Sequence, residues 1–271
     1  MSKKKGGKKS GGPRLVTGVG PVRELLAAAP SSIRRIWIAE SRHGASGRSG
    51  KDDPVQELAS IARDNGVAVS AVARVELDDM LGERVRHQGV IAESRPYRYA
   101  DTDEMLALAA DRGQDPLVVA VDGVTDPHNL GAIARSAYLL GAHGLIVPRD
   151  RNAEVNPTST KASAGAVEHL LIAQVTNLAR TLGELKEQGL WVHGVAATED
   201  AKELFEADLT GPMCLVLGSE GYGLRPLVAK QCDVGVLIPM HGEHVGSFNV
   251  SVAAAVALYE VDRQRRIGGS N

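Results

Sequence analysis

The chain has 271 residues, of which 43% are hydrophobic, 24% charged and 3% aromatic, and its net charge is −2. This composition is ordinary for a globular protein of one large or two modest domains, and the few aromatic residues do not favour a surface of stacked bases. Only Cys214 and Cys232 are present, both inside apolar runs, which excludes a disulfide framework and predicts core residues rather than metal ligands. With no apolar stretch long enough to span a membrane and no signal-peptide core after the first lysines, we expect a soluble, cytoplasmic protein.

Positive charge is concentrated at the N-terminus. Residues 1–14 contain five lysines and one arginine among glycines and serines, so we expect a disordered basic tail. Such a tail could strengthen binding to phosphates or only improve solubility, and the composition does not choose between the two.

Residues 15–94 alternate short helical and strand-like patterns and predict a small α/β domain. We expect helices at residues 22–29, 55–63 and 77–81, and strands at residues 35–39, 67–72 and 89–92. Residues 95–104, which include Pro96, read as a linker.

Residues 105–271 predict a second domain in which apolar strands alternate with helices. Strands are expected at residues 117–121, 144–147, 170–174, 191–196, 213–217 and 234–238, and helices at residues 130–140, 178–186 and 249–263. Continuous apolar strands separated by helices indicate a parallel sheet that is covered on both faces. Asn129 could cap the helix at residues 130–140.

Three segments carry polar residues at expected strand ends, where α/β sheets place their chemistry. The first runs from Asp122 to Arg135 and contains Asn129; these residues alone could be a cap and a surface arginine. The second is a glycine loop that begins at Gly218 and carries Glu220, with a G-x-x-G-x-G spacing that differs from the dinucleotide fingerprint G-x-G-x-x-G.

The third segment, residues 241–251, contains two histidines and then Ser247 and Asn249. His241 and His244 have no third ligand at a plausible spacing, so we expect no metal there. Ser247 and Asn249, taken alone, could be caps of the last helix.

Together and in this order, the three segments resemble the SpoU/TrmH family of RNA 2′-O-methyltransferases. The matching patterns are D-G-V-x-D-P-x-N-x-G-A-I-x-R-S-A, L-V-x-G-S-E-G-x-G-L and I-P-M followed by S-x-N-V-S-V-A-A, within residues 115–265. The family belongs to the SPOUT superfamily, so the resemblance implies an α/β domain with a mostly parallel sheet and a deep trefoil knot. The residues Val16-Thr17-Gly18 and His87-Gln88-Gly89-Val90 resemble the L30e-like RNA substrate-binding domain of the same family.

The resemblance implies S-adenosylmethionine as cofactor, RNA as substrate and a homodimer as the working form. The cofactor would be bound by Leu217, Gly218, Ile238, Met240 and Phe248, and the catalytic residues would be Arg135, Asn129, Glu220, Ser247 and Asn249. Arg135 would act on the ribose hydroxyl, either as a base or as a clamp for the adjacent phosphate and the developing alkoxide. Two departures affect the cofactor pocket: the loop at residues 240–247 is about one residue longer than in many relatives, and Phe248 stands where leucine is common.

The two-domain layout is most similar to enzymes that methylate a guanosine ribose of 23S ribosomal RNA. Three alternatives remain: a relative acting on transfer RNA, one acting on an antibiotic-target loop of ribosomal RNA, and a non-catalytic RNA-binding protein with the same knot. The set of polar residues from Asn129 to Asn249 favours catalysis, because a degenerate site would be expected to lose one of them.

Overall fold

The computed structural model describes residues 12–40, 53–81, 86–196, 200–219, 221–242 and 246–268, and the chain divides into two compact units, Met1–Arg98 and Tyr99–Asn271. Within these described ranges no helix is both long and apolar enough to cross a membrane. Of the two cysteines, Cys214 is buried, as predicted, and Cys232 is half-buried. Burial raises the pKa of both thiols, that of Cys232 to about 11.

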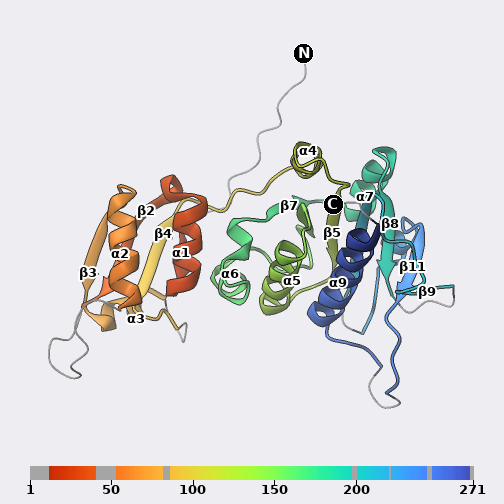
Figure 1. Ribbon diagram of the computed structural model, residues 1–271. Coiled ribbons are helices and arrows are strands. Elements are labelled where there is room, and N and C mark those ends of the chain that lie inside the picture. Colours follow the sequence, from red (N-terminus) through yellow and green to blue (C-terminus); the bar gives the residue numbers. More distant parts are fainter. Residues whose placement is uncertain are drawn as a thin grey trace. The chain divides into compact units, whose positions relative to one another are not determined.

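The first unit is built on a four-stranded sheet of order β1-β4-β2-β3 (Figure 1). Its elements are β1 (Arg14–Thr17), α1 (Val19–Ala28), the 3-10 turn η1 (Pro30–Ser32), β2 (Ile33–Ala39), α2 (Pro54–Asp64), β3 (Val69–Val72), α3 (Arg74–Leu81) and β4 (Val90–Ser94). Side chains of α1 and α2 form one buried cluster with alternate residues of the strands, among them Leu25, Leu58 and Ile36. The expected helices and strands are all present, and β1 was not predicted.

The second unit contains a seven-stranded sheet of order β7-β6-β5-β10-β8-β11-β9, and every neighbouring pair is parallel. Its strands are β5 (Leu117–Asp122), β6 (Gly144–Pro148), β7 (Leu171–Val175), β8 (Trp191–Val195), β9 (Lys202–Glu203), β10 (Met213–Gly218) and β11 (Val234–Leu237). Its helices are α4 (Thr102–Asp111), α5 (Pro127–Leu139), α6 (Pro157–Ala162), α7 (Leu178–Glu187), α8 (Pro226–Ala229) and α9 (Val250–Gly268), with the 3-10 turn η2 (Ala166–Glu168). The parallel sheet predicted from the apolar runs is confirmed.

The core of the second unit lies on both faces of the central strands. All six residues of β5 are buried, and Val118 and Ala120 pack with Met105 of α4 and Leu182 of α7. Successive residues of a strand point to opposite faces, so the remaining side chains of β5 face the side where α5 and α9 pack together (Figure 1). On this side α5 contacts β6 and α9 contacts β10.

Helices α6 and α8 and strand β9 were not predicted, and two further details differ from the expected elements. Asn129 does not cap α5: Asp126 does, accepting a hydrogen bond from the backbone N–H of His128 at 2.8 Å, because Pro127 is preorganised for the first helical position. Helix α4 begins at Thr102, inside the stretch expected to be linker, with a capping box between Asp101 and Glu104.

Candidate active site

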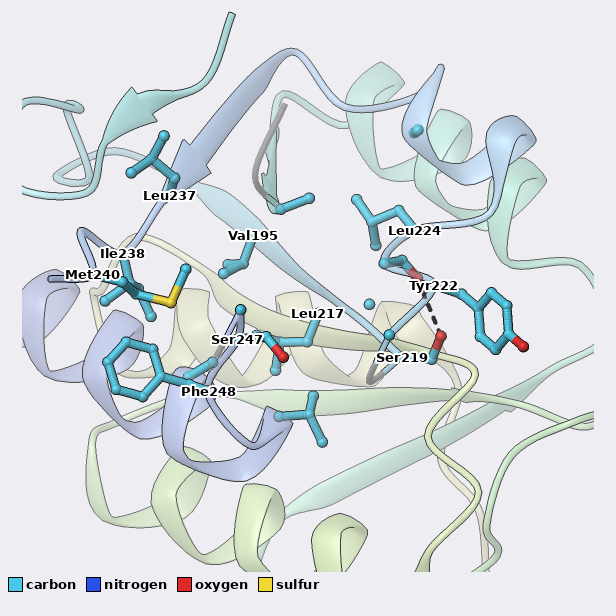
Figure 2. Close-up of a pocket in the computed structure, with 18 residues that line it drawn as sticks. Val195, Leu217, Ser219, Tyr222, Leu224, Leu237, Ile238, Met240, Ser247 and Phe248 are labelled. Carbon is cyan, nitrogen blue, oxygen red and sulfur yellow. Dashed lines mark hydrogen bonds between the residues drawn. The ribbon is translucent and has the colours of Figure 1, made fainter. Parts of the chain in front are cut away.

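A cavity of about 640 Å³ opens where β8, β10 and β11 end, at the carboxyl edge of the parallel sheet (Figure 2). Its walls come from these strand ends, from the loop after β10 and from the segment leading into α9. The lining residues are Val195, Ala196, Leu217, Gly218, Ser219, Gly221, Tyr222, Gly223, Leu224, Ala229, Leu237, Ile238, Met240, Gly246, Ser247, Phe248, Val250 and Ala253. All five residues expected to bind a cofactor are among them.

The loop after β10 presents main chain to the cavity. Ser219 and Gly223 exchange two backbone hydrogen bonds of 3.0 Å, which close a tight turn. A Cβ at Gly218 would lie 2.4 Å from the carbonyl carbon of Gly223, and Gly223 itself has φ +63°. Glycine is therefore required at Gly218 by close approach and is favoured at Gly223 by backbone conformation. Glu220 lies outside the described residues.

An ion pair between the buried carboxylate of Asp122 and the partly exposed side chain of Arg225 fastens this loop to the end of β5. The backbone N–H of Arg225 donates to Oδ2 of Asp122 at 2.8 Å, and its Nε donates to Oδ1 at 2.5 Å. Asp122 is only 1% exposed, so its carboxylate depends on Arg225 for compensation. The sequence places these residues 103 positions apart, and no local pattern indicated the pair.

The first and third polar segments meet through two asparagines. The side-chain amide of Asn249 donates to Oδ1 of Asn129 at 3.1 Å, which joins the first turn of α5 to the start of α9. Oδ1 of Asn249 also accepts from the backbone N–H of Ser251 at 2.9 Å, so Asn249 caps α9 as well. Ser247 is exposed and lines the cavity.

Of the expected catalytic residues that the structure describes, only Arg135 lies apart from the cavity and from the hydrogen bonds around it. It is exposed on α5, it does not line the cavity, and among the described residues its guanidinium makes no hydrogen bond or ion pair.

Several lining residues had no separate signal in the sequence. Val195 and Ala196 end a strand that was predicted, but the strand order that brings β8 beside β10 is not visible in a linear pattern. Tyr222 is 94% exposed and Ala253 lies in α9, where an alanine reads as ordinary helix packing.

Comparison with known proteins identifies the family of the chain. Residues 116–259 match the model of the SpoU rRNA methylase family, and residues 15–100 match that of RNA 2′-O ribose methyltransferase substrate binding. The chain belongs to the SpoU rRNA methylase family. The chain is 44% identical over 251 residues to the 23S rRNA (guanosine-2′-O-)-methyltransferase RlmB of Pseudomonas aeruginosa, covering 92% of this chain and 96% of that protein.

Two further proteins extend the comparison. The putative TrmH family tRNA/rRNA methyltransferase YacO of Bacillus subtilis is 39% identical over 92% of this chain and 95% of its own length. The crystal structure of the SpoU methyltransferase AviRb from Streptomyces viridochromogenes, in complex with AdoMet, matches with a TM-score of 0.75 and 29% identity, covering 95% of this chain and 92% of that one.

Proposed function

We propose that this protein transfers a methyl group from S-adenosylmethionine to the ribose 2′-hydroxyl of a guanosine in 23S ribosomal RNA. The observation that carries the proposal is the glycine-walled cavity at the carboxyl edge of the sheet, in a chain of the SpoU family. The reaction and the RNA are those named for the RlmB relatives, which match nearly the full length of the chain.

The cavity suits the cofactor in size and in lining. Its volume of about 640 Å³ is in the range of pockets that bury a nucleoside-sized ligand. Gly218 lets the backbone of Gly223 pack closely against it and so shapes this wall of the cavity, and Leu217, Ile238 and Phe248 offer apolar surface to an adenine ring. When bound, S-adenosylmethionine supplies a methyl group on a cationic sulfonium. We assign Leu217, Gly218, Ile238, Met240 and Phe248 to cofactor binding.

Arg135 is proposed as the residue that acts on the acceptor hydroxyl. A neutral alcohol is a weak nucleophile, so its proton has to be removed or shared while the oxygen is held in line with the methyl group. A guanidinium stays protonated under ordinary conditions, which favours a clamp on the neighbouring phosphate and on the developing alkoxide over a general base. The acceptor ribose has to lie between the cavity and Arg135, on one chain or across the proposed dimer.

Asn129 and Asn249 are proposed to orient the acceptor ribose through their shared hydrogen bond. Ser247, which lines the cavity, is proposed to help orient the same ribose. Glu220 is proposed as the fifth member of this set. Removal of either asparagine breaks the hydrogen bond that joins α5 to α9, so we expect positioning of the substrate to be lost before cofactor binding is.

The working form is proposed to be a homodimer that packs through α9. The buried face of this helix carries Ala254, Leu258 and Val261, and the opposite face carries Val252, Val256 and Tyr259, which are 46%, 38% and 61% exposed. An exposed apolar stripe at helical spacing is typical of a surface that a second helix covers.

Three finer features are proposed with the family assignment: a deep trefoil knot in the second unit, an L30e-like fold for the first, and a cytoplasmic location where ribosomal RNA is available. Support for the first unit as the RNA substrate-binding domain comes from its family-model match at residues 15–100.

The function is tested by binding and by mapping. Isothermal titration should give saturable heat with S-adenosylmethionine and none with NAD. The 2′-O-methyl sites of 23S ribosomal RNA should lack one guanosine in cells without the gene and regain it on complementation. Loss of a 2′-O-methyl site in transfer RNA instead would favour an enzyme that acts on transfer RNA. An unchanged methylation map with intact cofactor binding would favour a non-catalytic RNA-binding protein.

A further inference from the structure

Three loops follow one another along the carboxyl edge of the sheet, and one of them has no role in the site described above. Strands β6, β5 and β10 are parallel neighbours, so residues 149–152, 123–126 and 219–224 leave the sheet at the same edge. The last of these loops lines the cavity, and the middle one leads into α5 and Asn129. The first, residues 149–152, carries Arg149 and Arg151.

Loop 149–152 is held in place on both sides. The backbone N–H of Val124 donates to Oδ1 of Asn152 at 2.9 Å, and that of Ala153 donates to the carbonyl of Val124 at 2.8 Å. On its other side the backbone N–H of Arg149 donates to the carbonyl of Val175 at the end of β7 at 2.8 Å. The loop is therefore coupled directly to the segment that positions Asn129.

Neither arginine side chain of this loop is used by the described fold, and the backbone of Arg151 is strained. Arg151 has φ +60°, a left-handed conformation that a residue with a Cβ adopts only against a steric penalty. Both arginines are exposed, and neither guanidinium makes a hydrogen bond or ion pair with a described residue, although Asp150 and Glu154 are close in sequence. The nearby carboxylate of Asp126 is engaged as the cap of α5.

We propose that Arg149 and Arg151 bind phosphates of the RNA strand that flank the nucleotide to be methylated, and so position that nucleotide beside Asn129. The inference rests on the proposed function and names residues that hold its substrate. A guanidinium is suited to this task because its fork of N–H donors matches the oxygens of a phosphodiester. A phosphate bound here would give the two exposed guanidinium groups the partners that the described fold does not supply.

The test compares four variants with the unaltered protein: Arg149→Gln, Arg151→Gly, the combination of these two, and Arg151→Lys. Arg112→Gln is the matched control, because Arg112 is an exposed arginine just after α4 and before β5, at the amino edge of the same sheet. Arg151→Gly is chosen because glycine accepts the left-handed conformation, so the guanidinium is removed without strain.

We expect the double variant to raise the KM for a 23S ribosomal RNA transcript at least about tenfold, while the Kd for S-adenosylmethionine changes less than about twofold. The slope of log affinity for the RNA against log salt concentration should fall by about 0.7 for each single-strand phosphate that the variant no longer neutralises. Arg151→Gly should melt no lower than the unaltered protein, and Arg151→Lys, which keeps the charge, should retain the salt slope. Arg112→Gln should match the unaltered protein in all of these measurements.

Unchanged KM and salt slope in the double variant, with methyl transfer intact, would overturn the proposal. The proposal would also be overturned if the double variant had a higher KM but an unchanged salt slope and Arg151→Gly had a lower melting temperature. The loop would then act only through the stability of the fold. Failure of the unaltered protein to methylate any RNA would instead contradict the proposed function, so the two failures are distinguishable.

Discussion

At the scale of single residues, Gly218 is the position in the cavity wall where a side chain would clash with the backbone. Its missing side chain leaves space that the backbone of Gly223 fills, with 2.4 Å between a hypothetical Cβ and the Gly223 carbonyl carbon. We expect Gly218→Ala to weaken binding of S-adenosylmethionine at least about tenfold and to lower the free energy of unfolding by about 1–3 kcal/mol through overpacking. Titration calorimetry and urea denaturation measure the two effects.

Gly246→Ala is the matched control, since Gly246 lines the same cavity and a Cβ there would meet no atom within 4 Å. It should bind the cofactor within about twofold of the unaltered protein. Equal losses in both variants would mean that the cavity is sensitive to any substitution and that the close approach at Gly218 has no special role.

Arg135→Ala tests the proposed acceptor residue. Arg135 does not line the cavity, so the substitution should leave the Kd for S-adenosylmethionine unchanged. Turnover should fall at least about a hundredfold, because a charge that stabilises the developing alkoxide would be removed. Single-turnover transfer of labelled methyl to RNA measures this loss, and full activity of Arg135→Ala would remove Arg135 from the site. Arg180→Ala, at an exposed arginine on α7, provides the control.

The sequence identified residues that line the cavity, but it did not identify the ion pair that holds the adjoining loop in place. The resemblance of the three motifs to the SpoU/TrmH family pointed to Leu217, Gly218 and Ile238, which line the cavity. The pair of Asp122 and Arg225 could not be predicted, because it joins residues 103 positions apart through the strand order. The roles of the expected catalytic and cofactor residues stay predictions.

At the scale of elements, a buried arginine joins α9 to the segments that lead into β5 and β10. Arg265 is 9% exposed and donates to the carbonyls of Asp115, Pro116 and Gly211 at 2.9, 3.3 and 2.8 Å, and burial lowers the pKa of its guanidinium. Arg265→Met should lower the free energy of unfolding by about 2–4 kcal/mol, because the buried carbonyls lose charged donors. Urea denaturation measures the change.

The neighbouring residue provides the control for Arg265. Arg266 is exposed and pairs with Asp262 on the helix surface, so Arg266→Met should change stability by no more than about 0.5 kcal/mol. A loss at Arg265 no larger than that at Arg266 would mean that the three carbonyls find other partners.

Most elements with a clear pattern of their own were predicted, although α4 was missed, and several short elements that depend on their neighbours were also missed. The buried strands of the parallel sheet are continuous apolar runs, which are readable without a structure. Helix α6 was missed because Pro157, Thr158 and Ser159 are weak helix formers; it is capped by Asn156 and packs against Gly131 of α5, where a Cβ would meet Ser159 O at 2.4 Å. Strand β1 was missed because Arg14 reads as part of the basic tail, although it pairs with β4 along its length.

At the scale of the whole molecule, the proposed homodimer gives the last prediction. Tyr259→Glu places a charge in the middle of the exposed stripe on α9, which a partner helix would have to bury. We expect this variant to be monomeric by light scattering while its circular dichroism is unchanged. Leu227→Glu is the control, since Leu227 is 69% exposed on α8 and should not affect assembly. A monomeric unaltered protein, or a Tyr259→Glu dimer, would contradict the use of α9.

The buried carboxylate of Asp122 has a consequence for the catalytic cycle. It fastens Arg225 by both main chain and side chain, so the adjoining turn is held before any ligand arrives. Little conformational entropy is then lost on filling the cavity. The same preformed cavity will also accommodate the demethylated cofactor, which lacks only the methyl group and the positive charge on sulfur. We therefore expect release of the demethylated cofactor, rather than methyl transfer, to limit the rate of repeated turnovers.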